Sequence, residues 1–165
     1  MIEVTALCKQ FEVRERRSAF ALRSTTRRVT AVNDVSFVAR DGEVTGLLGP
    51  NGAGKTTTLR MLSTLLTPDS GSARIDGHDI AQGRAQVRRR LGVLGDAKGL
   101  YWRLTARENI AYFGRLHGLA ESEARQRADT LIDELGLHAL ADRPTQGFSQ
   151  GERMKVAIAR ALVHD

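Results

Sequence analysis

The sequence predicts an α/β domain organised around one glycine-rich loop, and three observations predict it. The stretch Glu43–Leu48 is short and largely apolar, which is typical of a buried strand. It leads into Gly49-Pro50-Asn51-Gly52-Ala53-Gly54-Lys55-Thr56, which fits the pattern G-x-x-x-x-G-K-[ST]. Beyond the loop, apolar residues recur at helical spacing, namely Leu59, Leu62, Leu65 and Leu66. A strand, a glycine-rich loop and a helix in this order are the context that identifies a P-loop.

The P-loop has the chemistry of a site for nucleotide phosphates. Glycines let the backbone approach a ligand closely, and successive N–H groups at the start of a helix form a concave anion site. Lys55 is expected to reach the β- and γ-phosphates, and the Thr56 hydroxyl to bind Mg²⁺. The alternative is a plain strand-to-helix turn with a surface lysine, and the flanking strand and helix argue against it.

Composition indicates one globular domain with enough apolar material for a core. The 165 residues are 41% hydrophobic and 27% charged, and no apolar run approaches the length that spans a bilayer. Glu3 and Thr5, which interrupt Ile2–Leu7, argue against a signal peptide. The single cysteine, Cys8, fits a reducing compartment. The net charge of +6 does not choose among nucleic acid, acidic lipid and an anionic ligand.

Two strands are expected before the loop, Ile2–Leu7 and Val29–Val38. The core candidates on the second strand are Val32, Val35 and Phe37. The segment Glu12–Arg28 carries six arginines against two glutamates and has no apolar periodicity, so we expect a solvated loop or strand extension. Docking of this segment onto anionic headgroups or an acidic partner is the functional alternative. Asp41-Gly42 predicts a tight turn into the P-loop strand.

After the P-loop helix, Ala73–Ile80 reads as a small hairpin with Asp76-Gly77 at its turn. A basic helix is expected over Arg84–Arg90, and a short buried strand over Leu91–Leu94. The strand leads into the flexible loop Gly95–Arg103.

Two amphipathic helices follow and predict a helical subdomain. The first begins at the capping box Thr105–Glu108 and ends near Gly118. Its apolar stripe is Ile110, Phe113 and Leu116. The second ends at Gly136, and its stripe is Ala124, Ala128, Leu131, Ile132 and Leu135. His117 and His138 lie near helix ends and are interpreted as ordinary surface histidines.

A second candidate anion site opens the last helix, predicted over Arg153–Val163. The run Phe148-Ser149-Gln150-Gly151-Glu152 contains a capping box, and simple capping is enough to explain it when it is taken alone. A serine and a bare glycine at a helix N-terminus also form an anion site. The P-loop earlier in the same chain favours this second interpretation.

With these motifs, the chain resembles the nucleotide-binding subunit of ATP-binding-cassette (ABC) transporters over nearly all of its length. Val44–Thr57 looks like the family's Walker A block, and Phe148–Glu152 lies where its signature motif lies. Ala157–Leu162 matches the helix after the signature, and Phe11 falls where the family places an aromatic residue that stacks on adenine. Gly99–Ile110 looks most like the sodium-extrusion (Nat-type) and drug-exporting ATP-binding subunits.

The resemblance implies the P-loop NTPase fold of ABC ATPases, with an N-terminal antiparallel β region and an inserted helical subdomain. It divides the chain into residues 1–94 (β region and P-loop core), 95–147 (loop-glutamine region and helical subdomain) and 148–165 (signature motif and helix). The implied ATP-binding residues are Phe11, Gly49, Pro50, Asn51, Gly52, Ala53, Gly54, Lys55, Thr56, Thr57, Ser149 and Gly151. The implied Mg²⁺ ligands are Thr56 and Asp96.

The chain departs from the family pattern at two motifs. Asp96 aligns with the loop glutamine that touches Mg²⁺ and couples to the membrane subunit, and its reach is shorter by one methylene. The signature carries Gln150 for a glycine and Glu152 for a glutamine, whereas its phosphate-binding serine and glycine are retained. The basic segment before the second strand also looks like an insertion, which surface loops tolerate.

By the same resemblance, the family's Walker B aspartate, catalytic glutamate and switch histidine would lie beyond Asp165. The resemblance therefore predicts a chain truncated before Walker B, whose C-terminal part is missing. We expect such a chain to bind ATP weakly and not to hydrolyse it, because the attacking water would have no base to position it. We also expect the underside of the last helix to be exposed.

The implied function is that of an ATP-binding subunit that uses MgATP binding and hydrolysis to drive export of Na⁺ or a drug through a membrane permease. In a head-to-tail homodimer or heterodimer, each ATP would lie between Lys55 and Thr56 of one chain and the signature of the other. The chain would lie in the cytoplasm, peripheral to the inner face of the cell membrane, with no specific nucleic acid as partner. Two alternatives remain: a soluble non-transport ABC ATPase, and a non-catalytic fragment that binds nucleotide or a partner.

Overall fold

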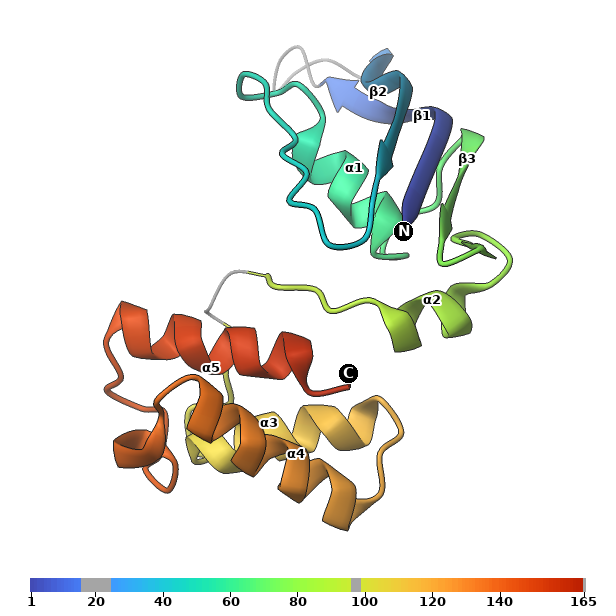
Figure 1. Ribbon diagram of the computed structural model, residues 1–165. Coiled ribbons are helices and arrows are strands. Elements are labelled where there is room, and N and C mark those ends of the chain that lie inside the picture. Colours follow the sequence, from blue (N-terminus) through green and yellow to red (C-terminus); the bar gives the residue numbers. More distant parts are fainter. Residues whose placement is uncertain (16–24, 96–98, 165) are drawn as a thin grey trace. The chain divides into compact units, whose positions relative to one another are not determined.

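The computed structural model describes residues 1–15, 25–95 and 99–164. They fold as two compact units, Met1–Arg88 and Arg89–Asp165. In Figure 1 the first unit consists of an antiparallel sheet with helix α1, and the second consists of packed helices. The basic helix expected over Arg84–Arg90 forms as α2 (Arg84–Arg90), and the boundary between the two units falls within it. The predicted combination of an N-terminal antiparallel β region with a helical part is confirmed.

The sheet of the first unit has the described strands in the order β2-β1-β3-β4. β1 (Ile2–Glu15) pairs antiparallel with β2 (Thr25–Ala39) on one side and with β3 (Ser70–Ile75) on the other. β3 pairs in turn with β4 (His78–Asp79). The buried apolar side chains of these strands are Val4, Leu7, Val32, Ala73 and Ile75.

Local turn chemistry explains the β3–β4 hairpin. Asp76 and Gly77 have φ angles of 47° and 78° and connect Ile75 to its partner His78. Two central residues with positive φ make the turn whose twist matches a hairpin. The predicted hairpin and its turn are therefore confirmed.

The basic segment is a strand extension at its two described ends. Glu12 pairs with Arg28, and the register continues to Glu15 opposite Thr25. The prediction for residues 16–24 lies outside the described residues.

Two predicted buried strands are wrong. Residues 43–48 and 91–94 are not strands, and Val44, Leu48 and Val93 are exposed. The turn at Asp41-Gly42 does form. A central strand is stabilised by its neighbours in the sheet, and no strand among the described residues pairs with either stretch. Apolar composition alone was not enough to make them strands.

Helix α1 (Lys55–Leu62) is shorter than predicted, and only part of the predicted leucine stripe is buried. Its buried residues are Thr58, Met61 and Leu62, whereas Leu59 and Leu65 are exposed. The helix ends because Ser63 is its C-cap and Thr64 takes a positive φ of 59°. The leucine stripe therefore predicted the helix correctly but its buried side only at Leu62.

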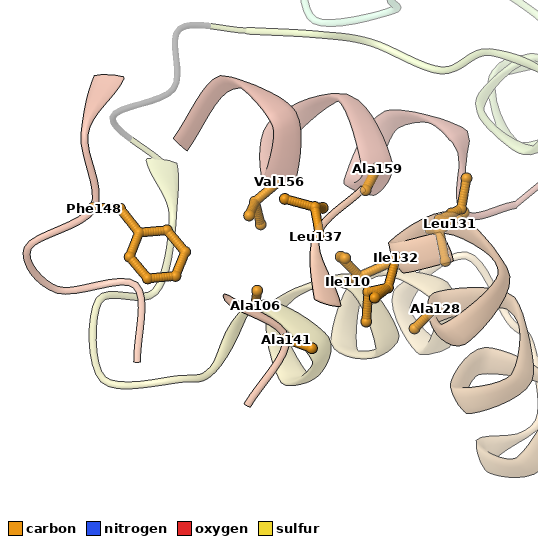
Figure 2. Packing of buried hydrophobic residues seen from close by; sticks show 11 residues of the cluster. Ala106, Ile110, Ala128, Leu131, Ile132, Leu137, Ala141, Phe148, Val156 and Ala159 are labelled. Atoms are coloured by element: carbon orange, nitrogen blue, oxygen red, sulfur yellow. The ribbon is translucent and has the colours of Figure 1, made fainter. Parts of the chain in front are cut away.

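The second unit has a continuous apolar core between its helices (Figure 2). These are α3 (Ala106–Leu116), α4 (Glu121–Glu134), the 3₁₀ turn η2 (His138–Leu140) and α5 (Gln150–Leu162). The core residues are Ala106, Ile110, Ala128, Leu131, Ile132, Leu137, Ala141, Phe148, Val156, Ala159 and Val163. The predicted helical subdomain and its two stripes thus form as expected, apart from Leu116, which is exposed.

Two further expectations about this unit need correction. The underside of α5 is largely covered, because Val156 lies in the core of the second unit and Ala157 is buried. Ala161 is half-buried, and Leu162 near the end of the helix is exposed. His117 is half-buried and stacks on His164, with ring centroids 4.5 Å apart, so it is not an ordinary surface histidine. His138 is exposed, as expected.

No helix among the described residues is long and apolar enough to cross a membrane.

Candidate nucleotide-binding site

The P-loop leads directly into α1 in the first unit. Gly54 is the N-cap of α1, with φ 83°, and its carbonyl accepts a hydrogen bond from the Thr58 amide at 2.8 Å. Within the loop, the Ala53 amide donates to the Pro50 carbonyl at 3.2 Å. The first N–H groups of a helix have no intrahelical partner. The loop and the helix start therefore present backbone donors together.

Gly54 cannot be exchanged for a residue with a side chain without moving the backbone. A Cβ at this position would lie 2.1 Å from the carbonyl oxygen of Ala31 in β2. The positive φ adds strain for any residue other than glycine. The sheet thus fixes the base of the P-loop through this one close approach.

Lys55 folds back over its own loop. Its ammonium Nζ donates to the carbonyls of Gly49 and Pro50, at 2.6 and 2.7 Å. An ammonium has three donors, so a third hydrogen bond remains available in this arrangement. A phosphate bound in the loop would compete with both carbonyls for the cation, and charge-assisted bonds to phosphate are the stronger ones.

Electrostatics also favour an anion at this helix end. The first turn of α1 contains no acidic residue, and Gly54 supplies no capping side chain. The positive end of the helix dipole is therefore not neutralised by the helix itself. The remaining P-loop residues, Asn51 to Ala53, are exposed beside it.

The threonines after the lysine differ in exposure. Thr56 is exposed, Thr57 is half-buried, and Thr58 is buried with its hydroxyl donating to the Gly54 carbonyl at 3.0 Å. The described residues contain no group of three or more His, Cys, Asp or Glu side chains that could hold a metal ion. Mg²⁺ commonly takes only one or two protein oxygens beside phosphate and water, and the Thr56 hydroxyl fits that donor set. Asp96, the other predicted ligand, lies outside the described residues.

Phe11 lies in β1 opposite Val29 of β2 and is 39% exposed. The Lys9 ammonium lies 5.7 Å from its ring centroid, and the same ammonium donates to Asp69 at 2.6 Å. A partly exposed ring held on a sheet can stack on a planar base. Its predicted adenine contact stays a prediction.

The predicted phosphate ligands of the second unit lie at the start of α5. Ser149 is the N-cap, and its Oγ accepts from the Glu152 amide at 3.3 Å. In return the Ser149 amide donates to Glu152 Oε2 at 2.7 Å. Gly151 is exposed, and the space beside it is open, so a ligand could approach the backbone there.

Glu152 places a negative charge at this helix end. Hydrogen bonds from the Ser149 backbone and then its side chain hold the pKa of Glu152 below its usual range, so the carboxylate is ionised at neutral pH. The capping interpretation and the anion-site interpretation of this motif are therefore both open in the structure.

Two residues that the sequence interpretation did not single out are tightly bound in the second unit. Asn109 is fully buried, and its side chain makes hydrogen bonds to the backbone of Tyr101, Leu104 and Thr105. Arg160 donates to the Gly99 carbonyl at 2.8 Å and lies over the Phe113 ring. The only sequence signal for either is a polar residue on an otherwise apolar helix face.

Comparisons with known proteins agree with these motifs. A family model described as ABC transporter matches residues 32–165. The chain is 51% identical over 138 residues to the ABC transporter ATP-binding protein NatA of Bacillus subtilis, which covers 83% of this chain and 56% of that protein. It is 46% identical over 136 residues to the doxorubicin resistance ATP-binding protein DrrA of Mycobacterium tuberculosis, covering 82% of this chain and 41% of that protein.

The fold is similar to that of a solved ATP-binding cassette. That structure is a dimeric post-hydrolysis state bound to ADP and Pi, with a TM-score of 0.79 at 24% identity over 99% of this chain and 70% of that chain. At this identity the likeness concerns the fold. The chain spans about half the length of the curated relatives it matches.

Proposed function

The chain belongs to the ABC transporter family, and from that premise we propose that it is the ATP-binding part of an exporter, which uses MgATP to drive Na⁺ or a drug through a membrane permease. The observation that carries the proposal is the P-loop at the start of α1, with Lys55 held over it and no acidic residue in the first turn. Support for export comes from the names of NatA and DrrA, which are transport and drug-resistance ATP-binding proteins.

ATP binding would begin with the triphosphate entering the P-loop. Backbone N–H groups and the helix dipole would hold the β-phosphate, since the start of α1 presents both without a competing carboxylate. Lys55 would exchange the carbonyls of Gly49 and Pro50 for phosphate oxygens. Thr56 would supply one oxygen ligand to Mg²⁺, which would neutralise the phosphate charge. Phe11 would stack on the adenine.

A second nucleotide-binding chain would cover the same ATP from the other side. Ser149 and Gly151 of that chain would donate to the γ-phosphate, and the open space beside Gly151 supports this. Two such chains in head-to-tail arrangement would close on two ATP molecules. The dimer would lie on the cytoplasmic face of the membrane against the permease, and its closure would move the permease.

The test is nucleotide binding by the full protein, followed with a fluorescent MgATP analogue. Lys55→Ala should weaken binding about tenfold or more, because the phosphates lose their cation. Arg60→Ala is the matched control, since it removes an exposed cation from the same helix and should leave binding unchanged. Equal affinities for the parent and Lys55→Ala would rule out the P-loop as the nucleotide site.

A further inference from the structure

The strap, defined here as Gly99–Thr105, is fixed to helix α3 by one buried side chain. Asn109 Nδ2 donates to the carbonyls of Tyr101, Leu104 and Thr105 at 3.0, 3.2 and 2.9 Å. Its Oδ1 accepts from the Tyr101 amide at 2.9 Å. A buried amide with all of these bonds made specifies one backbone conformation. The strap is therefore a shaped part of the second unit.

The strap is also paired with the segment that leads into the signature motif. The amides of Thr145 and Gln146 donate to the carbonyls of Leu104 and Trp102, both at 3.0 Å. The Thr145 hydroxyl donates to the Tyr101 carbonyl at 3.1 Å. Shortly after this pairing comes Phe148, which is buried in the core (Figure 2) directly before the N-cap of α5.

Arg160 makes a second connection, from the far part of α5 to the first residue of the strap. Its Nη1 donates to the Gly99 carbonyl at 2.8 Å, and its guanidinium lies 3.5 Å from the centroid of the Phe113 ring. The side chain is half-buried, and burial lowers the pKa of Arg160, although a guanidinium keeps its charge at any physiological pH.

This position is a costly one for a cation. Among the described residues, no ion pair includes Arg160, and its Nε is buried without a hydrogen-bond partner. Desolvating a charge without a carboxylate partner is unfavourable, and an aliphatic side chain would cover Phe113 at lower cost. An aliphatic residue could provide neither the hydrogen bond to Gly99 nor the cation–π contact with Phe113, and only the hydrogen bond reaches the strap.

We propose that Arg160 is a positioning residue that couples α5 to the strap, so that nucleotide engagement at Ser149 and Gly151 displaces the strap and a load on the strap displaces α5. The inference rests on the proposed nucleotide role of those two residues. α5 is then held to the strap at both ends, through the Thr145–Gln146 pairing before its N-terminus and through Arg160 near its C-terminus. On its outer side the strap exposes Tyr101 and Trp102, at 46% and 52%.

The first experiment needs no nucleotide and measures amide hydrogen exchange in the full protein. Arg160→Met keeps an apolar cover on Phe113 but cannot bind Gly99, and exchange at the strap amides Tyr101 and Leu104 should become about tenfold faster. Arg160→Lys should recover part of the protection. Arg115→Met is the matched control, because Arg115 is an exposed arginine on α3. Equal strap exchange in Arg160→Met and Arg115→Met would overturn the proposal.

The second experiment follows the strap directly during nucleotide binding. Trp102 is the single tryptophan of these 165 residues, and any tryptophan elsewhere in the full protein would be replaced by phenylalanine. Adding MgATP should change the Trp102 emission of the parent and of Arg115→Met. Arg160→Met should lose most of that change while binding a fluorescent MgATP analogue with the affinity of the control, and Arg160→Lys should regain part of it.

The outcomes separate the coupling from the proposed function. A parent that binds the MgATP analogue without any change in Trp102 emission, or an Arg160→Met variant with the full change, would overturn the coupling. A parent that binds no nucleotide would instead contradict the proposed function, and the exchange measurement would then decide the position of Arg160 by itself.

Discussion

The molecule contains two helix starts that the sequence marks as phosphate sites, and they are built in opposite ways. α1 begins at a glycine with no capping side chain and no acidic residue in its first turn. α5 begins at Ser149, whose capping box with Glu152 is complete in both directions. The N-terminus of α1 therefore leaves its N–H donors available to a ligand, whereas the N-terminus of α5 already carries the Glu152 carboxylate.

This difference indicates different roles in binding. An uncapped helix start with a lysine beside it attracts phosphate by itself. A helix N-terminus that is capped by its own carboxylate has little net attraction for an anion. The N-terminus of α5 would therefore supply further hydrogen bonds to a phosphate that the P-loop of another chain already holds. The comparison supports the proposal that the P-loop binds the nucleotide first and that the signature contacts it afterwards.

The largest difference between the two helix N-termini is expected when their cap residues are exchanged. Gly54→Ser should destabilise the first unit by about 3 kcal/mol or more, because its Cβ would meet the Ala31 carbonyl oxygen at a positive φ. Ser149→Gly should cost only a few tenths of a kcal/mol, since glycine is a tolerated N-cap. Urea unfolding of the ligand-free protein measures both. Similar losses for the two variants would mean that the P-loop backbone is free to move away from β2.

The cap residues also show which features the sequence could predict. Capping boxes at Thr105 and Ser149 and the hairpin turn at Asp76-Gly77 are set by residues within a few positions of one another, and all three form as expected. The helical subdomain follows for the same reason, since each of its helices carries its own apolar stripe.

Most of the features that were predicted wrongly or not at all depend on residues far away in the sequence. Residues 43–48 and 91–94 have the composition of buried strands, but a strand needs a neighbour, and none of the described strands pairs with them. The roles of Asn109 and Arg160 could not be predicted, because their hydrogen-bond partners are backbone groups, which the side-chain pattern does not identify. The nucleotide roles of the predicted site residues stay predictions, and Asp96 lies outside the described residues.

Removing the negative charge of Glu152 should make the N-terminus of α5 resemble that of α1, which has no acidic residue in its first turn. Glu152→Gln keeps a side chain that can accept from the Ser149 amide but removes the negative charge near the proposed γ-phosphate. MgATP-dependent dimerisation of the full protein should strengthen about two- to fivefold, as expected for one charge at a helix N-terminus. Analytical ultracentrifugation with and without MgATP measures it.

The matched control for that change is Glu108→Gln. It alters the equivalent capping box of α3, where the Thr105 amide donates to Glu108 at 2.8 Å, and should leave dimerisation as it was. Weaker dimerisation in Glu152→Gln than in Glu108→Gln would show that the carboxylate assists the site, and the contrast between the two helix starts would then be wrong.

The smallest expected effect concerns the other end of α5, where His164 stacks on His117 of the α3 C-cap. Burial, and then the neighbouring His164, lower the pKa of His117 below its ordinary value of 6.5. The unfolded chain therefore binds this proton more readily, so the contribution of His117 to stability is fully present above pH 6.5 and is lost as the pH falls below it. The measurement is thermal unfolding at pH 7.5 and 5.5. The loss of stability between the two pH values should be smaller for His117→Gln than for the parent. His138→Gln, which changes an exposed histidine of the same unit, should behave like the parent. If His117→Gln lost as much stability on acidification as the parent does, folding would not lower the pKa of His117, and the stacked pair would contribute nothing to the pH dependence of stability.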